Sequence, residues 1–290
     1  MRTLIIGCGY VGLALGKDLA QDGHEVHGMR RTPRADLQLR SNQITPLYAD
    51  ITKPESLSTL PSDYDWIVNC VSSAGGGPEE YRQVYLEGTR NLIKWLTAGP
   101  PQRYVYTSSS SVYSQTDGSV VDEASPIEPT TETAHMLAQT EQVLLAAQQN
   151  TSLEAIVLRV AGIYGPGRGY WLRGYLNGEA RLEGDGQRWL NMVHRDDVVG
   201  AIAAALQHGT PGEIYNVVDD EPVTQLALYQ WLSAKTGRAV PPRIEIGTGR
   251  EIRRGLTNKR VSNRKLKENL GYALKYPSFR EGFARELEPG

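Results

Sequence analysis

A glycine-rich turn lies between an apolar segment and a helical segment in the first twenty residues of this chain. Residues 1–6 read MRTLII, residues 7–12 read GCGYVG, and residues 13–20 read LALGKDLA. This order predicts a strand, a tight turn and a helix, with the G-x-G-x-x-G spacing of a dinucleotide-binding site. The segment therefore favours folds in which a parallel sheet carries a phosphate-binding turn.

Each glycine of the turn has a separate physical role in such a site. Gly7 allows the tight turn, Gly9 lets a pyrophosphate approach the backbone, and Gly12 lets the helix pack closely on the strand. The N–H groups of the first helical turn, at Tyr10 and Val11, then face the phosphates. We expect these five residues to bind a cofactor. A purely structural glycine turn is the alternative.

Apolar strand-like segments alternate with helical ones after this turn. We expect strands at residues 3–6, 25–29, 43–49, 66–71, 103–107 and 153–158. We expect helices at residues 11–21, 81–96 and 131–148. Such alternation is typical of the α/β class, here a doubly wound parallel sheet of the Rossmann type with helices on both faces.

The character of the sequence changes after residue 160. Residues 162–169 are rich in glycine, and four arginines occur close together, namely Arg168, Arg173, Arg181 and Arg188. We expect residues 1–160 to form the cofactor-binding domain, with a return of the chain at about residues 193–220. Residues 161–290 are expected to form a smaller substrate-binding region. The arginines are candidates to hold a phosphorylated or carboxylated substrate, with solvation at the surface as the alternative.

Composition excludes several classes of protein. The 290 residues carry a formal net charge of −2, which gives no electrostatic reason to bind nucleic acid. No apolar run approaches the roughly 20 residues that span a membrane, and no signal peptide is recognisable. Cys8 and Cys70 end predicted core strands, and with five scattered histidines they suggest neither a disulfide framework nor a metal site. We expect a cytoplasmic protein.

The end of the second predicted strand favours NADP over NAD. NAD-binding folds place an acidic residue there to hold the ribose 2′-hydroxyl, whereas an arginine accommodates the 2′-phosphate of NADP. Here the strand runs into Arg30 and Arg31, and no carboxylate follows until Asp36. Two guanidinium groups can bind a phosphate in bidentate fashion. We predict NADP as the cofactor, with a solvated basic loop as the alternative.

Further motifs follow in a fixed order along the chain. They are Gly88-Thr-Arg-Asn-Leu92, Tyr106-Thr-Ser-Ser-Ser-Ser-Val-Tyr113, Leu158-Arg-Val-Ala-Gly-Ile-Tyr-Gly-Pro-Gly167, Val193-His-Arg-Asp-Asp197, Tyr215-Asn-Val217 and Lys259-Arg-Val-Ser-Asn263. With these motifs the chain resembles the extended short-chain dehydrogenase/reductase superfamily, the NAD(P)-dependent sugar epimerases and dehydratases. The resemblance covers almost the whole chain and implies the same doubly wound fold.

The resemblance also implies roles for residues at the ends of the third and fourth predicted strands. Asp50 and Ile51 match the segment whose aspartate holds the adenine. Cys70, Val71 and Ser72 match the strand end that passes behind the cofactor. We therefore expect these residues to contact the nucleotide.

The serine-rich segment matches the strand that ends at the active site. Thr107 and Ser108 are expected to contact the cofactor, and Ser109 stands at the position of the active-site serine or threonine. By resemblance Ser109 hydrogen-bonds the reacting carbonyl or hydroxyl of a substrate. A contact with the nicotinamide ribose alone is the alternative. Tyr113 is a candidate catalytic phenol, with core packing as its other role.

The chain departs from the superfamily at the acid–base pair. Those enzymes use Tyr-x-x-x-Lys, in which the lysine lowers the pKa of a phenol that is otherwise near ~10. None of the fifteen tyrosines here has a lysine four residues later. Aligned on Glu141, the tyrosine position holds Thr133 and the lysine position holds Leu137, and Tyr85 stands where asparagine is usual. The pattern resembles atypical members such as the bacterial YeeZ-like group.

Three other side chains are candidates for the missing acid–base group. His135 has an imidazole side chain, a type that often serves as an acid–base group, but a spacing of two residues from Thr133 puts it on another helix face. Tyr164 has Arg168 four residues later, a cation that lowers a phenol pKa when the two are in contact. His194 precedes two aspartates, which the resemblance explains as the start of a helix.

These observations predict an NADP(H)-binding oxidoreductase or epimerase-like enzyme with a non-standard proton donor. The expected partners are a small, anionic substrate and a second copy of the chain. A non-catalytic NADP-binding sensor or scaffold is the alternative, because the usual acid–base pair is absent.

Overall fold

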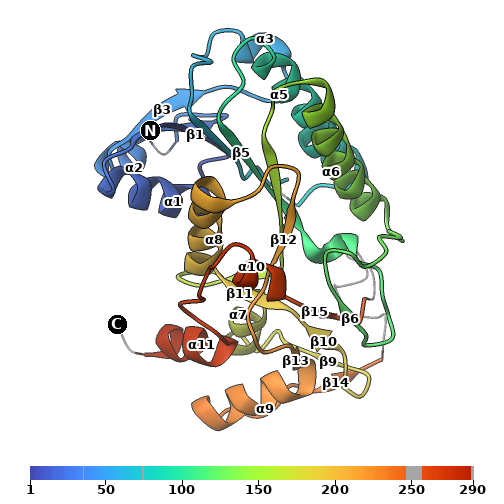
Figure 1. Ribbon diagram of the computed structural model, residues 1–290. Coiled ribbons are helices and arrows are strands. Elements are labelled where there is room, and N and C mark those ends of the chain that lie inside the picture. The colour runs from blue at the N-terminus through green and yellow to red at the C-terminus, as the bar shows by residue number, and fades with distance from the viewer. Residues whose placement is uncertain (35, 74, 246–256, 289–290) are drawn as a thin grey trace.

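Strands from both halves of the chain build one central sheet. The computed structural model describes residues 1–34, 36–73, 75–245 and 257–288. Within these residues the main sheet has seven strands, all parallel, in the order β12-β7-β5-β4-β1-β2-β3 (Figure 1). The strands are β1 (Arg2–Ile6), β2 (Glu25–Arg30), β3 (Ile44–Tyr48), β4 (Trp66–Asn69), β5 (Arg103–Ser109), β7 (Ala155–Val160) and β12 (Ile214–Val217).

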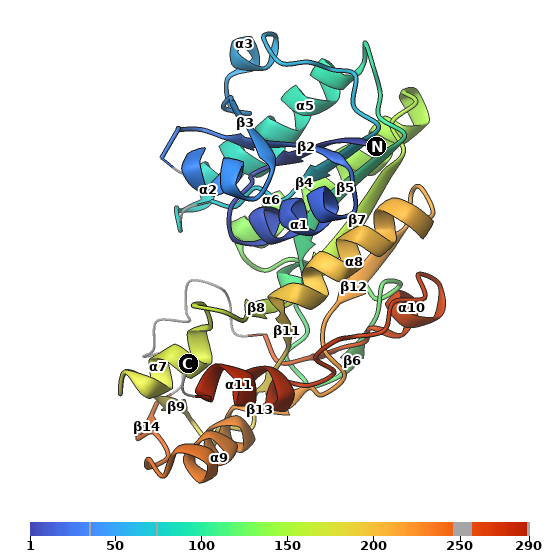
Figure 2. The ribbon, with the colours of Figure 1, turned by 90° about the vertical axis from the view of Figure 1, so that its left-hand side faces the viewer.

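The central strands are buried because helices cover both faces of the sheet. Every residue of β4 and of β7 is buried, as their runs of Val, Ile and Leu require in a parallel sheet. Helices α1 (Tyr10–Gln21) and α8 (Arg195–His208) lie on one face, and α5 (Gly88–Leu96) and α6 (Glu132–Asn150) lie on the other (Figure 2). This arrangement confirms the predicted doubly wound α/β fold.

The last strand of the sheet comes from far along the chain. β12 pairs with β7 in parallel, with Tyr215 opposite Leu158. The segment 193–220, where the sequence suggests a return of the chain, contains α8 and then β12. The return adds a seventh strand at the β7 edge and a helix beside α1.

The segment predicted as one helix over residues 81–96 is divided into three parts. α4 (Pro78–Tyr81) leads into a π-helical turn, η1 (Arg82–Glu87), and α5 follows. π-helical turns are rare and occur frequently at functional sites. This one contains Tyr85, whose side chain is buried against the sheet. Hydrophobic periodicity does not distinguish such a turn from a regular helix.

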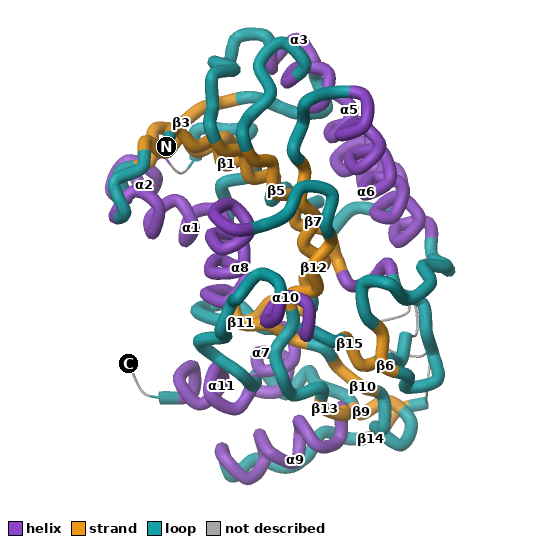
Figure 3. Tube along the Cα trace, viewed as in Figure 1, coloured by secondary structure: helices purple, strands orange, loops and turns teal. Residues whose placement is uncertain are grey.

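A second, smaller hydrophobic core lies below the sheet. In this core, α7 (Tyr170–Leu176), α9 (Gln225–Thr236) and α11 (Phe279–Leu287) pack together through buried residues such as Tyr175 and Leu228. Short strand pairs surround it (Figure 3): β8 (Gly162–Tyr164) with β11 (Met192–His194), β9 (Leu182–Glu183) with β14 (Arg243–Ile244), β10 (Trp189–Leu190) with β13 (Val223–Thr224), and β6 (Val120–Val121) with β15 (Arg260–Val261). Further short helices are α2 (Asp36–Ser41), α3 (Pro54–Leu57), η2 (Ser110–Val112) and α10 (Arg264–Glu268). None of the helices in the described ranges is long and apolar enough to cross a membrane.

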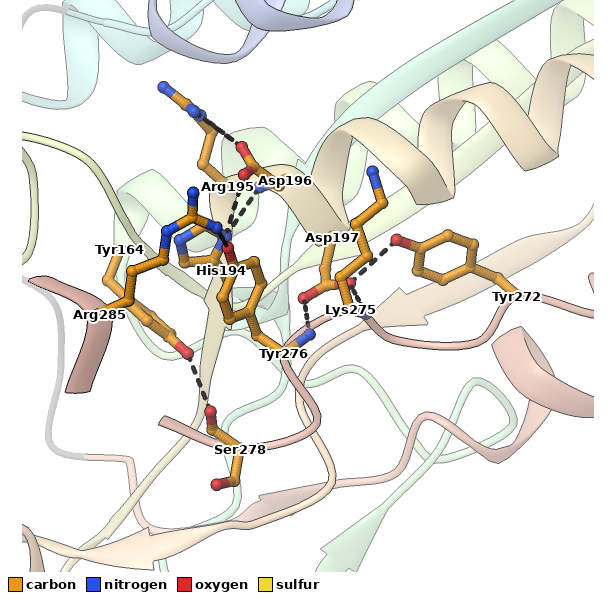
Figure 4. Close-up of polar contacts among 10 residues, drawn as sticks. All are labelled: Tyr164, His194, Arg195, Asp196, Asp197, Tyr272, Lys275, Tyr276, Ser278 and Arg285. Atoms are coloured by element: carbon orange, nitrogen blue, oxygen red, sulfur yellow. Dashed lines mark hydrogen bonds and ion pairs between the residues drawn. The ribbon is translucent and has the colours of Figure 1, made fainter. Parts of the chain in front are cut away.

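Asp197 in the first turn of α8 ties the C-terminal segment to the sheet. Its carboxylate accepts hydrogen bonds from the backbone N–H groups of Lys275 at 2.6 Å and Tyr276 at 3.0 Å (Figure 4). The Tyr272 hydroxyl donates a third bond at 2.9 Å. Because Asp197 is fully buried, these donors compensate for the lost hydration of its carboxylate.

Candidate functional site

A cavity of about 700 Å³ lies at the carboxyl ends of the sheet strands. It crosses the sheet where the strand order reverses, between β1 and β4, and doubly wound folds bind their ligands at such a point. From the glycine turn after β1 the cavity passes the ends of β2, β4 and β5. It continues to Trp171, Trp189 and Lys259 of the C-terminal part of the chain.

The glycine turn forms an open backbone cradle. Gly7 has a φ of +81°, and a Cβ there would lie 2.7 Å from backbone atoms of Val71. A Cβ on Gly12 would lie 2.8 Å from Ile5 Cγ2, so α1 packs directly on β1. At Gly9, the nearest atom to a Cβ is the carbonyl oxygen of Gly7, 3.7 Å away. Gly9 lines the cavity, and its open side fits a pyrophosphate held against the backbone.

Tyr10 adds an unpaired polar atom beside this cradle. Its hydroxyl is buried and has no hydrogen-bond partner within the described residues. Arg168 and Arg195 place their guanidinium groups 5.1 Å and 5.3 Å from the centre of its ring. Burial raises the pKa of the Tyr10 phenol, which therefore keeps its proton as a donor. A buried donor next to two cations is suited to an anionic group of a ligand.

Two arginines stand at the end of β2, as the sequence indicates. Arg30 Nε donates to the carbonyl oxygen of Cys8 at 2.5 Å, which fixes the guanidinium beside the glycine turn. Arg31 is exposed and lines the same end of the cavity. Asp50 also lines it and accepts bonds from the backbone N–H and the hydroxyl of Thr52, at 3.0 Å and 2.8 Å. Among the described residues that line the cavity, Asp50 alone has a carboxylate side chain.

The ends of β3 and β4 are held by side chains from the helices that follow. Asn91 Nδ2 donates to the carbonyl oxygen of Ile51 at 2.8 Å and so fixes the segment next to Asp50. The Tyr85 hydroxyl accepts a bond from the backbone N–H of Ser73 at 3.0 Å. Residues 70–72 line the cavity between these two contacts. The π-helical turn thus positions a strand end of the cavity.

A buried charge network stands behind the end of β5. Arg159 and Glu141 are each 2% exposed and form an ion pair, with Nη2 2.8 Å and Nε 3.1 Å from Oε2. The Ser108 hydroxyl donates to Glu141 Oε1 at 2.5 Å. Arg159 Nη1 donates to the Tyr113 hydroxyl at 2.8 Å, and that hydroxyl donates to Asn216 Oδ1 at 2.9 Å. The network holds the serine-rich strand end in place from within the core.

The wall of the cavity beyond β5 carries Ser109, Thr133 and Leu137. Ser109 Oγ accepts a bond from the backbone N–H of Ser111 at 3.2 Å, which leaves its own proton available to a ligand. The Thr133 hydroxyl lies 3.2 Å from that of Thr131. The two positions that the sequence resemblance aligns with the superfamily's tyrosine and lysine thus line the cavity with a short hydroxyl and a hydrocarbon side chain.

All site residues predicted from the sequence line the cavity except Gly12 and Tyr113. Gly12 lies beneath the turn, in the packing role expected of it. Tyr113 is fully buried in the charge network, so its geometry favours a structural role over contact with a ligand. Tyr164 is buried and donates to the carbonyl oxygen of Ser278 at 3.3 Å. His135 lies in a separate hollow between α4 and α6.

His194 begins helix α8 and is not among the residues that line the cavity. Its Nδ1 accepts a bond from the backbone N–H of Asp196 at 3.1 Å, which places the ring proton on Nε2. The ring packs on that of Tyr276, with 3.8 Å between centroids (Figure 4). Burial lowers the pKa of His194 to about 4, so the ring is neutral at pH 7. The structure therefore gives His194 a capping role.

The far end of the cavity is cationic and aromatic. Of the four arginines considered from the sequence, Arg168 and Arg188 line this end. Arg173 and Arg181 instead donate to nearby backbone carbonyl groups.

Sequence reasoning missed Trp171, Trp189 and Lys259, which line the far end of the cavity. Lys259 opens the last of the ordered motifs, and that position was the one signal available for it. Trp171 lies in the short helix α7 and Trp189 in the two-residue strand β10, and neither segment has a recognisable sequence pattern.

Comparisons with known proteins agree with this geometry. The sequence model of the NAD dependent epimerase/dehydratase family matches residues 3–217. Protein YeeZ of Escherichia coli is 28% identical over 284 residues, which cover 95% of this chain and 96% of that protein. The 3-diazoavenalumate denitrifying reductase of a Streptomyces species is 28% identical over 320 residues, covering 99% of this chain and 100% of that protein.

Solved structures share the fold. DesIV, the dTDP-glucose 4,6-dehydratase of Streptomyces venezuelae solved with NAD bound, has a TM-score of 0.84 and 23% identity to this chain. The similarity covers 98% of this chain and 95% of that one. With the family model matching most of the chain and the motifs in order, the chain belongs to the NAD-dependent epimerase/dehydratase family.

Proposed function

We propose that the protein is an NADP(H)-dependent oxidoreductase or epimerase-like enzyme for a small anionic substrate. The observation that carries this proposal is one continuous cavity, which joins the glycine turn to Ser109 and to the cationic far end. Five cationic side chains line it, namely Arg30, Arg31, Arg168, Arg188 and Lys259, against the single carboxylate of Asp50 among the described residues. This excess of positive charge suits a phosphorylated cofactor together with an anionic substrate.

The choice of NADP over NAD rests on the end of β2. Arg30 is anchored through Nε, which leaves its two Nη groups for the 2′-phosphate, and exposed Arg31 adds a second guanidinium. A hydrogen bond to a charged group contributes about 1.5–3 kcal/mol, so each such contact strengthens binding roughly 10–140-fold.

The remaining lining residues fit the rest of such a nucleotide. Gly9, Tyr10 and Val11 would hold the pyrophosphate, and Asp50 and Ile51 would lie against the adenine. When bound, NADP(H) supplies or accepts a hydride equivalent. In this proposal residues 1–160 and 193–220 hold the cofactor, and the rest of the chain holds the substrate.

Ser109 is proposed to orient the substrate. Its hydroxyl proton is available and faces the same cavity, so it can donate to the oxygen of a substrate carbonyl. Arg168 and Arg188 would bind the anionic group of that substrate.

Oxidation of NADPH tests the function directly. Absorbance is followed with 2-oxo acids and with sugar phosphates that have a free carbonyl group. Epimerisation or dehydration of dTDP-glucose and UDP-glucuronic acid returns the hydride to the substrate, so these two compounds are incubated with NADP⁺ and their products are separated by chromatography. We expect turnover with an anionic carbonyl compound, reduced at least tenfold in Ser109→Ala and unchanged in Ser114→Ala, a serine outside the cavity lining. Tight NADPH binding with neither NADPH oxidation nor product formation on the whole panel would favour the non-catalytic sensor.

A further inference from the structure

Lys259 is a buried lysine at the far end of the cavity. Its side chain is almost fully enclosed, with the residue 4% exposed, yet it lines the cavity. Nζ donates one hydrogen bond, to the carbonyl oxygen of Tyr113 at 2.7 Å. A lysine ammonium has three protons to donate. No carboxylate in the described ranges forms an ion pair with Lys259, so two of its donors remain for a ligand.

Contacts of the backbone fix the position of this amine. Asn191 Nδ2 donates to the carbonyl oxygen of Lys259 at 2.9 Å, and Asn191 Oδ1 accepts from the N–H of Val261 at 2.8 Å. Val261 belongs to β15, which pairs with β6. The carbonyl group that binds Nζ belongs to Tyr113, at the end of the loop that begins with Ser109. The amine therefore contacts the end of the loop that begins with Ser109, the proposed substrate-orienting serine.

The surroundings of Nζ make it a proton donor at neutral pH. Burial alone lowers the pKa of Lys259 to about 8. Among the described residues, Arg168 and Arg188 line the same cavity, Glu183 forms an ion pair with Arg188 at 3.6 Å, and the Arg159–Glu141 pair lies behind Ser108. At pH 7 about nine-tenths of such an amine is protonated, and a general acid works best with a pKa near the working pH.

We propose that Lys259 donates the proton to the reacting oxygen of the substrate, in place of the absent Tyr-x-x-x-Lys pair. This inference rests on the proposed function. In carbonyl reduction, the carbonyl carbon would receive a hydride equivalent from NADPH, when bound, as the C=O π bond breaks. The oxygen takes a proton from the Lys259 ammonium to give an alcohol, and the neutral amine regains a proton from water. The sum is carbonyl plus NADPH plus H⁺ to alcohol plus NADP⁺.

A structural role for Lys259 is the competing explanation, because its bond to Tyr113 also holds the loop. Lys259→Arg separates the two roles. Arginine keeps the positive charge and a donor for the carbonyl group of Tyr113, but its guanidinium does not release a proton near neutral pH. Lys259→Met removes both functions. Lys265→Met is the matched control, since Lys265 pairs with Glu213 away from the cavity.

Competitive labelling of the ligand-free protein tests the amine without any substrate. A trace of acetic anhydride is added over a range of pH values, and acetylation of each lysine is read by peptide mass spectrometry. We expect Lys259 to react with a midpoint near pH 8 and to be protected by NADP⁺ plus a bound substrate analogue from the panel. An amine that stays unreactive at every pH, or titrates at the ordinary value of about 10.4, would overturn the proposal.

Kinetics with the substrate found on the panel complete the test. We expect kcat to fall at least 100-fold in both Lys259→Met and Lys259→Arg, with the Kd for NADPH within threefold of wild type. In wild type, kcat should decline above pH 8, and the residual rate of Lys259→Arg should lack this decline. Recovery of wild-type kcat in Lys259→Arg would assign the residue a structural role and overturn the proposal. If wild type itself gives no turnover, the proposed function fails, whereas the labelling result still decides whether Lys259 is a titrating amine in the cavity.

Discussion

Replacing Glu141 by alanine leaves the charge of Arg159 unpaired in the core. Both residues are 2% exposed, and Glu141 provides the acceptors for Nε and Nη2 of Arg159. The one other side-chain partner of this guanidinium in the described structure is the Tyr113 hydroxyl. Removal of one member of a buried ion pair costs about 3–5 kcal/mol. The Ser108 hydroxyl loses its acceptor in the same variant.

Thermal unfolding followed by circular dichroism measures this effect. For a chain of this size, 1 kcal/mol shifts Tm by roughly 2–4 °C, so Glu141→Ala should lower Tm by about 6–20 °C. Glu141→Gln retains the shape and an acceptor and should lose less. The double variant Glu141→Leu with Arg159→Met removes both charges and should be more stable than Glu141→Ala. A loss below about 1 kcal/mol in Glu141→Ala would refute the argument that this ion pair fixes the end of β5.

Three further predictions concern the cradle, a buried histidine and a buried thiol. Gly9→Ala should weaken NADPH binding at least tenfold and leave Tm nearly unchanged. Gly7→Ala should lower Tm, because its Cβ would lie 2.7 Å from the Val71 backbone. Equal effects of the two variants on Tm would contradict the cradle geometry. Burial lowers the His194 pKa from 6.5 to about 4, so the folded state binds fewer protons than the unfolded state between these pH values. The free energy of unfolding should therefore fall by at most about 3 kcal/mol as the pH is lowered from 6.5 to 4. His194→Asn should lose less Tm than wild type when the pH is lowered from 7 to 5. The same loss in both proteins would contradict this assignment to His194. Burial raises the pKa of Cys8 to about 12, so its thiol should react with Ellman's reagent at pH 8 only after unfolding; rapid reaction of the native protein would contradict this.

Local sequence patterns predicted the sheet, and most of the residues singled out from them line the cavity at the glycine turn. The G-x-G-x-x-G turn is a local structure formed by residues close together in the chain. The spacing of Gly7, Gly9 and Gly12 is therefore enough to predict its geometry. Arg30 is the last residue of β2, Asp50 lies two residues after the end of β3, and parallel strands bring their carboxyl ends to one edge of the sheet. These residues meet in the cavity because the fold class alone determines where strand ends lie.

The far end of the cavity depends on contacts between distant segments, which local patterns do not contain. Lys259 reaches the cavity because β15 pairs with β6, about 140 residues earlier in the chain. Tyr113 turns inward because Arg159 and Asn216 offer partners in the core. Likewise, the helical period of residues 81–96 gave no sign of the π-helical turn that holds Tyr85.

The preference for NADPH over NADH tests the central claim most directly. Isothermal titration calorimetry gives both dissociation constants for wild type, Arg30→Asp, Arg31→Ser and the control Arg34→Ser, an exposed arginine of the same loop outside the cavity lining. We predict that wild type and Arg34→Ser bind NADPH at least tenfold more tightly than NADH. The preference should fall in Arg31→Ser and be lost in Arg30→Asp, with NADH binding retained. Equal or tighter binding of NADH by the wild-type protein would contradict the account.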